Sequence, residues 1–153
     1  MTEKKKSTRG ELVKNDGTWT QAKFNSFIKN NLRSATRKWG PIHKCTKDAR
    51  VARGLYECAE CKDHVPASIV DPEKRCRVKN IFVDHIVPIV DPALGFISWD
   101  SVIERMFCDS SNLQLLCLKC HKAKSQEEID IAKARRAKQK LQDLIIDDET
   151  FEI

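Results

Sequence analysis

Apolar residues recur at helical spacing between residues 19 and 39, and this periodicity predicts the first helix of the chain. The apolar positions of this stretch are Trp19, Phe24, Phe27, Ile28, Leu32, Ala35 and Trp39. Thr20 has the hydroxyl of an N-cap, and Gly40-Pro41 is a helix stop signal. The positions between them include the basic residues Lys23, Lys29, Arg33, Arg37 and Lys38. We therefore predict an amphipathic helix with one basic face, followed by a second helical stretch from about 46 to 55.

Two short apolar segments farther along the chain predict strands. The segment NIFVDHIVPIV is rich in β-branched residues, and Pro88 limits how far it can pair. The segment LQLLCL predicts a second strand, which leads into a Cys-x-x-Cys pair and then a helix. Between the two strands we expect a loop and a helix from about 99 to 107. Ser125 and Glu128 have the spacing of a capping box, which predicts that a long charged helix opens at Ser125.

These elements predict an α+β chain organised in four parts. Residues 1–17 are expected to be a flexible basic tail, and residues 18–55 a basic helical region. Residues 56–125 contain both predicted strands and two Cys-x-x-Cys pairs, so they form the expected core. Residues 126–153 are expected to be a C-terminal helix with an acidic tail that frays.

The net charge of +6 is unevenly spread over the 153 residues. Residues 1–53 carry 14 Lys and Arg against 4 Asp and Glu, whereas the last eleven residues carry 5 acids and no base. A basic front third favours a polyanionic partner, because Lys and Arg displace condensed counterions from nucleic-acid phosphates. A solvated basic helix without any partner is the alternative.

Hydropathy and the first residues indicate where the chain works. Hydrophobic residues make up 41% of it, and the longest apolar runs are far too short to cross a bilayer. The opening MTEKKKSTRGE is polar and lacks the apolar region of a secretory signal. We therefore expect the cytoplasm, a compartment in which thiols stay reduced.

Seven cysteines include two Cys-x-x-Cys pairs, formed by Cys58, Cys61, Cys117 and Cys120. Two short loops that each supply two thiolates can close the tetrahedron that Zn²⁺ prefers. We therefore predict a structural four-thiolate zinc site, with free core thiols or a redox pair as the alternatives. His64 is a conceivable substitute ligand. The remaining cysteines are expected to be reduced and partly buried, and they are Cys45, Cys76 and Cys108.

The dipeptide Asp84-His85 lies inside an apolar strand, where a charged residue is costly without a partner or a role. A satisfied Asp–His pair at a strand end is one explanation. However, Asn112 and His121 lie beside the second Cys pair, so a metal at the cysteines would bring these polar groups together. A carboxylate and two imidazoles suit a hard divalent cation and a general base. Because adjacent strand residues point to opposite faces, we expect a bulge, a bend or the strand end at Asp84-His85.

Three blocks of sequence follow one another within residues 56–125, namely Y-E-C-x-x-C, D-H-I-x-P and N-L-Q-x-L-C-x-x-C-H-x-x-K. Together they resemble the HNH endonuclease family. The resemblance implies a ββα-metal core that binds and cuts DNA. The basic region before the core is similar to the N-terminal part of small phage-borne members, which implies a phage-encoded protein acting in the host cytoplasm.

Carried over by position, the resemblance implies that Asp84 and His121 hold a catalytic divalent ion such as Mg²⁺ or Mn²⁺. His85 would be the general base that activates water, and Asn112 would tie the loop between the strands through backbone hydrogen bonds. The chemistry of the residues agrees, because neutral His85 can take a proton from water near pH 7. A cation on Asp84 and His121 can contact a phosphate oxygen and the leaving oxygen.

Double-stranded DNA is the expected partner, with monomer and homodimer both left open. The residues predicted to contact phosphates are Lys23, Arg33, Arg37, Lys38, Arg50, Arg53, Lys124, Arg135 and Arg136. The basic stretch 132–140 is equally compatible with a helix that projects into solvent. A non-catalytic zinc module that binds nucleic acid is the alternative function. A thiol–disulfide protein is disfavoured, because neither Cys-x-x-Cys pair opens the helix of a βαβ pattern.

Overall fold

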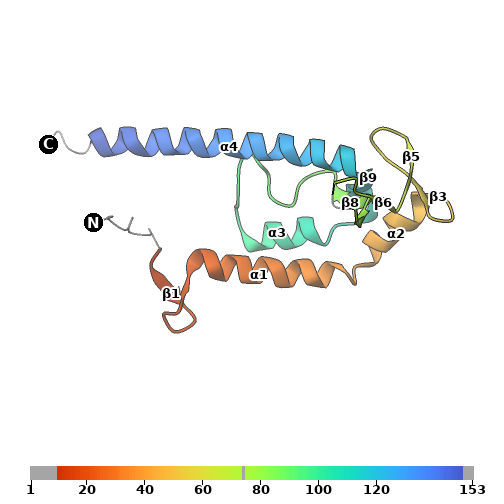
Figure 1. Cartoon of the computed structure of the whole chain (residues 1–153). Coiled ribbons are helices and arrows are strands. Elements are labelled where there is room, and N and C mark those ends of the chain that lie inside the picture. Colours follow the sequence, from red (N-terminus) through yellow and green to blue (C-terminus); the bar gives the residue numbers. More distant parts are fainter. Residues whose placement is uncertain (1–9, 74, 150–153) are drawn as a thin grey trace. The chain divides into compact units, whose positions relative to one another are not determined.

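The structure, a computed structural model, describes residues 10–73 and 75–149, with the backbone alone for residues 143–149. The chain divides into two compact units, Met1–Lys38 and Trp39–Ile153. Figure 1 shows the order of the elements. Residues 1–9 of the expected basic tail and residues 150–153 of the expected acidic tail lie outside the described residues.

The first unit contains a short β-hairpin and a helix, namely β1 (Leu12–Lys14), β2 (Trp19–Thr20) and α1 (Gln21–Thr36). β1 pairs antiparallel with β2 across a turn whose residues 15–17 have positive φ. Part of the segment that we predicted to be flexible is therefore a hairpin. Thr20 caps α1 as predicted, since its hydroxyl accepts a hydrogen bond from the backbone N–H of Lys23 at 3.1 Å.

The second unit opens with a helix where the sequence predicted a stop. α2 spans Gly40–Asp48 and carries Pro41 in its first turn. Proline suits this position, because the first turn needs no backbone N–H donor and the ring presets a helical φ. The prediction of a helix over 46–55 is wrong, since a three-stranded antiparallel sheet follows α2. Its strands are β3 (Arg50–Ala52), β4 (Leu55–Glu57) and β5 (His64–Pro66).

A second hairpin, which the sequence patterns did not predict, follows this sheet. Its antiparallel strands are β6 (Ser68–Val70) and β7 (Arg77–Lys79). Asp71 holds the turn, because its backbone N–H donates to Cys76 O at 2.9 Å and its carboxylate accepts from the N–H of Glu73 at 2.9 Å. Strands of three residues are too short for an alternating pattern to be recognised.

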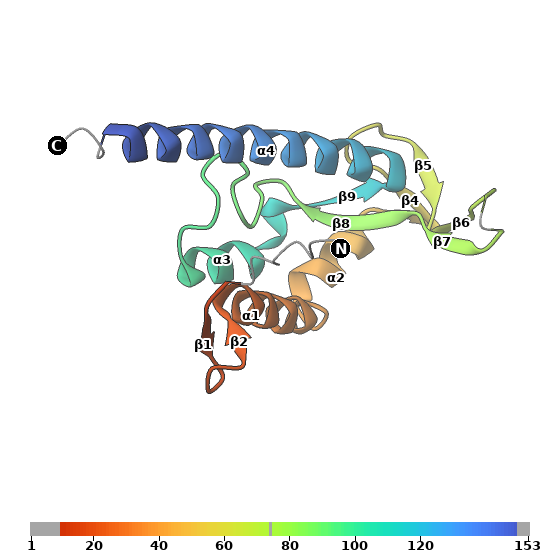
Figure 2. The same cartoon turned by 60° about the vertical axis from the view of Figure 1, so that its left-hand side comes forward.

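The central element of the second unit is an antiparallel pair of strands, β8 (Ile81–His85) and β9 (Leu113–Cys117), both in predicted segments. The pairing runs without irregularity from Ile81↔Cys117 to His85↔Leu113. The connection between them contains α3 (Trp99–Met106), as predicted, and a 3-10 turn, η1 (Ser110–Asn112). In both views the connection from β8 to α3 rises to the middle of the C-terminal helix (Figures 1 and 2).

That helix, α4, spans Leu118–Glu149 without a break and follows β9 directly. The prediction that a helix opens at Ser125 is therefore wrong. The actual start is supported by the backbone N–H of Leu118, which donates to Asn80 O at 3.0 Å and so satisfies one of the unpaired donors of a helix N-terminus. None of the described helices, α4 included, is long and apolar enough to cross a membrane.

The core of the second unit gathers around β9. Its buried apolar residues are Cys58, Ile81, Val102, Met106, Leu113, Leu115, Leu116 and Cys117. Val102 and Met106 come from α3, and Cys58 comes from the turn between β4 and β5. The chain is thus α+β, as predicted, and β8 pairs with β9, which leads directly into α4, so that the three elements form a strand–strand–helix unit.

Candidate functional site

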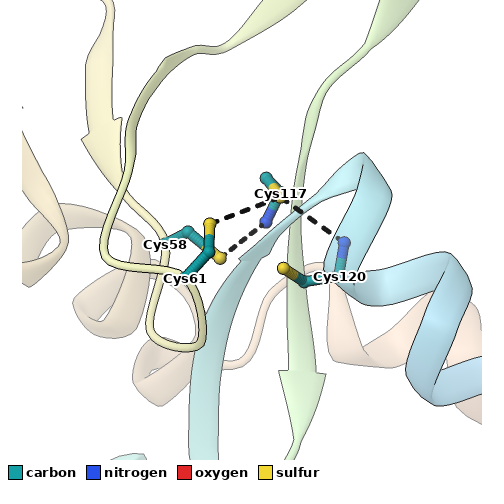
Figure 3. Close-up of side chains that lie close together, drawn as sticks. All are labelled: Cys58, Cys61, Cys117 and Cys120. Carbon is teal, nitrogen blue, oxygen red and sulfur yellow. Dashed lines mark hydrogen bonds between the residues drawn. The ribbon is translucent and has the colours of Figure 1, made fainter.

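The four cysteines of the two Cys-x-x-Cys pairs gather at one place, as predicted (Figure 3). Cys58 and Cys61 lie on the turn between β4 and β5, Cys117 ends β9, and Cys120 lies in the first turn of α4. Their sulfur atoms all lie within 4.8 Å of one another. The two loops are 55 residues apart in sequence, and the backbone N–H of Ala59 donates to Leu115 O at 2.8 Å, which holds the first loop against β9.

The spacing and chemistry of the sulfurs fit a tetrahedral metal such as zinc. Cys61 Sγ and Cys117 Sγ are 4.0 Å apart, close to the ~3.8 Å edge of a tetrahedron with 2.3 Å Zn–S bonds. The backbone N–H of Cys117 donates to Cys58 Sγ at 3.3 Å, and that of Cys120 donates to Cys117 Sγ at 3.5 Å. Such bonds orient the sulfurs and favour thiolates, which are the form that binds zinc.

The thiols of this cluster have strongly divergent pKa values. Burial opposes ionisation of Cys58, but backbone hydrogen bonds, that of Cys117 foremost, outweigh it and lower the pKa of Cys58 to about 7. Burial and the neighbouring thiols of Cys117 and Cys61 raise the pKa of Cys120 to about 12. Four crowded sulfurs cannot all become anions on their own, whereas a bound cation would allow it.

The other candidate ligands lie outside this cluster. His64 Nε2 faces Glu57 Oε2 at 3.8 Å across the β4–β5 pair, and its side chain is exposed. Cys45 and Cys108 are free and partly buried, as expected, whereas Cys76 is free and exposed. The expectation that Cys76 is partly buried is wrong, because it lies in the turn of the β6–β7 hairpin.

At the end of β8, the carboxylate of Asp84 binds a cationic side chain. Lys124 Nζ on α4 lies 2.5 Å from Asp84 Oδ2, and it also donates to the backbone carbonyl of His85. Gln114, the cross-strand neighbour of Asp84, donates to the same carboxylate oxygen at 3.3 Å. Glu128 Oε1 is 3.4 Å from Lys124 Nζ. A carboxylate and a backbone carbonyl therefore converge on one positive charge.

His85 points to the other face of the strand. Because the β8–β9 pairing is regular through His85, the side chains of Asp84 and His85 alternate, and the expected bulge does not occur in this pair. The expectation is met only in that β8 ends at His85. His85 Nε2 lies 3.4 Å from the carbonyl oxygen of Met106, the last residue of α3. The imidazole is half-buried.

Asn112 ties down the segment that follows β8. Its Oδ1 accepts a hydrogen bond from the backbone N–H of Val87 at 2.8 Å, and its Nδ2 donates to Val87 O at 3.3 Å. Its own carbonyl accepts from the N–H of Ile86 at 2.9 Å. These bonds fix the chain next to His85, which is the role that the family resemblance implies for this position.

His121 lies in the first turn of α4 and packs on an aromatic ring. The imidazole stacks on Phe82 with ring centroids 4.6 Å apart and an interplanar angle of 19°. Phe82 and Asp84 are two residues apart in β8, so both side chains leave the strand on the face toward α4. Lys79 Nζ lies 5.0 Å from the centroid of the same Phe82 ring.

The predicted residues thus reach the same end of the strand–strand–helix unit without forming a second closed cluster. Within residues 10–73 and 75–142, whose side chains the structure describes, only the four cysteines bring three or more Cys, His, Asp or Glu ligand atoms within 4.8 Å of one another. Sequence reasoning missed the contacts of Gln114, Phe82 and Lys79. The first two are signalled by strand register, because Gln114 pairs with Asp84 and Phe82 shares its face.

The residues predicted to contact phosphates fall into two groups. Most of them are exposed, namely Lys23, Arg33, Arg37, Lys38, Arg50, Arg53 and Arg136. Arg50 and Arg53 lie on and after β3 rather than on a helix. Lys124 and Arg135 are instead partly buried. Lys124 pairs with Asp84, and the guanidinium of Arg135 packs over Gly95, so neither projects freely toward a ligand.

Comparisons of the chain with protein-family models, with characterised proteins and with solved structures found no match. The resemblance to HNH endonucleases therefore remains a prediction that rests on three sequence blocks.

Proposed function

We propose that the chain is a metal-dependent endonuclease of double-stranded DNA, with an HNH-type core. The observation that carries the proposal is the Lys124 ammonium, which is held at the end of β8 by Asp84 and the His85 carbonyl. The site that binds this positive charge and the half-buried imidazole of His85 lie on opposite faces of the same strand end, and together they offer the two features that phosphodiester hydrolysis requires. These are charge neutralisation at the phosphate and a base for water.

The contacts of His85 support its role as the base. A backbone carbonyl only accepts hydrogen bonds, so the 3.4 Å contact with Met106 O favours the tautomer that carries its proton on Nε2. Nδ1 is then the unprotonated nitrogen of the neutral ring. It takes a proton from water, the resulting hydroxide attacks phosphorus, and the bond to the 3′ oxygen breaks, with a solvent proton completing the leaving hydroxyl.

Asp84 and His121 are the proposed holders of the divalent ion. A bound Mg²⁺ or Mn²⁺ there would neutralise phosphate charge and stabilise the leaving oxygen. The Lys124 ammonium marks a cation position between the Asp84 carboxylate and the His85 carbonyl, both of which are hard oxygen donors that suit these ions. Asn112 holds the chain beside His85 in a fixed position.

The four-cysteine cluster is proposed to hold a structural zinc ion. Cys117 ends β9 and Cys120 lies in the first turn of α4, so zinc at this cluster would fix the angle between strand and helix. It would thereby place Asp84 on β8 opposite Lys124 and His121 on α4. Four thiolates close a tetrahedron and leave no open position for substrate, which suits a structural rather than a catalytic ion.

Nicking of supercoiled plasmid with Mg²⁺ or Mn²⁺ tests the proposal. The wild-type protein should convert the plasmid to open circles, and His85→Ala should slow this by roughly 10²-fold or more, the usual contribution of a general base. His64→Ala is a matched control, because His64 is exposed and faces Glu57. Zinc content and DNA binding should be the same in all three proteins. The proposal would be refuted if the wild-type protein left the plasmid intact both with Mg²⁺ and with Mn²⁺.

A non-catalytic zinc module that binds nucleic acid is the second candidate. It is favoured by the satisfied state of Asp84, which already has Lys124 and Gln114 as partners, and by the stacking of His121 on Phe82. On this view the polar groups stabilise the fold and need no divalent ion. DNA binding without nicking, together with one zinc per chain, would select this candidate.

A further inference from the structure

The β6–β7 hairpin has one basic face and one face turned toward the protein. The register pairs Ser68 with Lys79, Ile69 with Val78 and Val70 with Arg77. Because directly paired residues share a face and faces alternate along a strand, Arg77, Lys79 and Val70 lie together. All three are exposed, whereas Ile69 and Val78 on the opposite face are half-buried.

The cationic groups of this face have no acidic partner among the described residues. None of the ion pairs in that part of the chain involves Arg77 or Lys79. Two exposed lysines elsewhere in the second unit do have one, since Lys44 Nζ lies 2.5 Å from Asp48 Oδ2 and Lys133 Nζ lies 3.3 Å from Asp130 Oδ1. The hairpin therefore presents positive charge that its own fold leaves unneutralised.

Asn80 fixes the base of the hairpin to the rest of the second unit. Its side chain is buried and donates to Pro66 O at 3.0 Å, and its backbone N–H donates to Ala67 O at 2.9 Å. Its carbonyl accepts from Leu118 N at 3.0 Å, at the start of α4. The hairpin is therefore anchored on both sides at the residue that precedes β8.

The basic face also adjoins the candidate catalytic residues. Lys79 Nζ lies over the Phe82 ring, and His121 stacks on that same ring. Phe82 and Asp84 leave β8 on one face, so the lysine, the imidazole and the carboxylate follow one another along it. A polyanion bound along Arg77 and Lys79 would extend toward the end of β8 that carries Asp84.

We propose that the β6–β7 hairpin is a duplex-docking ribbon that lies in the major groove of DNA, next to the site of cleavage. A two-stranded ribbon has the width that the major groove admits, and proteins use such ribbons there. Arg77 and Lys79 contact the phosphates that line the groove and the base edges at its floor. Val70, the cross-strand neighbour of Arg77, packs beside these two side chains. The inference rests on the proposed function, because it takes DNA to be the substrate.

Binding to a fluorescent duplex, measured by anisotropy over a range of salt concentrations and without added divalent ion, tests the ribbon separately from cleavage. For Arg77→Gln/Lys79→Gln, the slope of log affinity against log salt should decrease in magnitude by about 1 to 2, since each phosphate contact contributes about 0.9. The matched control is Lys44→Gln/Lys133→Gln, which removes two lysines that already have acidic partners and should leave the slope unchanged. Exchanging the two cations, as Arg77→Lys/Lys79→Arg, should also preserve it.

The groove is tested with methyl green, a dye that occupies the major groove. At saturating dye, wild type and Arg77→Gln/Lys79→Gln should bind the duplex equally. A difference that survives the dye would overturn the major-groove placement, and an unchanged slope, or an equal loss in the control pair, would overturn the ribbon. Should the double variant fail to fold by circular dichroism, Arg77→Gln alone should lower the slope by about 0.9.

The outcomes distinguish this inference from the proposed function. Plasmid nicking by the wild type, together with an unchanged salt slope for Arg77→Gln/Lys79→Gln, would support the endonuclease and contradict the role of the hairpin in DNA binding. The expected change in slope without any nicking would support the ribbon and remove the endonuclease. A wild-type protein that does not bind the duplex would overturn both.

Discussion

Lys124 Nζ lies 2.5 Å from Asp84 Oδ2, so a helix and a strand that begin 37 residues apart share one ion pair at the candidate site. The side chains of the two residues are 24% and 20% exposed, which shields the pair from solvent more than a surface pair. Glu128 and the His85 carbonyl also contact the ammonium. A divalent ion that binds Asp84 Oδ2 at the position of this ammonium would therefore displace Lys124.

Such a displacement would make Lys124 an internal competitor of the proposed catalytic ion. We expect Lys124→Met to bind Mn²⁺ roughly 10-fold or more tightly than the wild type, because a hydrogen bond to a charged group contributes about 1.5–3 kcal/mol. Isothermal titration of zinc-loaded protein measures this directly, without reference to nicking. Lys122→Met, an exposed lysine of the same helix, should leave the affinity unchanged. Equal affinities for wild type and Lys124→Met would show that Mn²⁺ binds elsewhere.

Zinc content should depend on Cys58 and not on Cys76. Cys58 is fully buried within the four-sulfur cluster, whereas Cys76 is exposed in the hairpin turn. Structural zinc contributes about 10–16 kcal/mol in small model domains, so Cys58→Ser should lose the metal and unfold the second unit at room temperature. Metal analysis and circular dichroism of Cys58→Ser and Cys76→Ser provide the comparison. A folded, zinc-free Cys58→Ser protein would contradict a structural metal.

Removing the Asn112 side chain should loosen the segment after His85. Its amide makes two hydrogen bonds to the backbone of Val87, and Asn112→Ala leaves both backbone groups without that partner. We expect the free energy of unfolding to fall by about 1–3 kcal/mol, measured by urea denaturation. Plasmid nicking should fall as well. Ser111→Ala, at the preceding position, should change neither quantity.

The parts that the sequence predicted are those with a strong local signal. β8 and β9 are apolar runs of sufficient length, and α3 has helical periodicity. The N-cap at Thr20 could be predicted because a residue with a hydroxyl group precedes the first apolar position of α1. The four cysteines gather as predicted, since ligand spacing within each pair is itself local information.

What the sequence did not predict depends on register and on competing signals. The Ser125-x-x-Glu128 spacing also occurs inside a continuous helix, and α4 begins at Leu118 because β9 and Asn80 hold its first turn. Lys124 looked like a phosphate contact, since its partner Asp84 is 40 residues away and reaches it only through the β8–β9 register. Contacts of this kind depend on tertiary structure, so local sequence patterns do not predict them.

Arg135, which we predicted to contact DNA, packs against the connection between β8 and α3 in the structure. A Cβ atom at Gly95 would lie 2.1 Å from Arg135 Nη1, a distance that real Cβ atoms essentially never show. Gly95 is buried, has a φ of +83°, and closes a turn in which its N–H donates to Asp91 O at 2.7 Å. Gly95→Ala therefore faces both a clash with Arg135 and a backbone conformation unfavourable for alanine.

A double-mutant cycle separates these two effects. Gly95→Ala should lower the free energy of unfolding by about 1–2 kcal/mol from the left-handed backbone alone, and by more while Arg135 is present. In the Arg135→Ala background the clash is gone, so the same substitution should cost less, giving a coupling of about 0.5 kcal/mol or more. Urea denaturation of the four proteins provides the cycle, with Gly40→Ala as a control, since nothing lies within 4 Å of that position. Additive effects would mean that the Arg135 side chain does not pack on Gly95 when the protein is in solution. Arg135 would then be available to contact DNA.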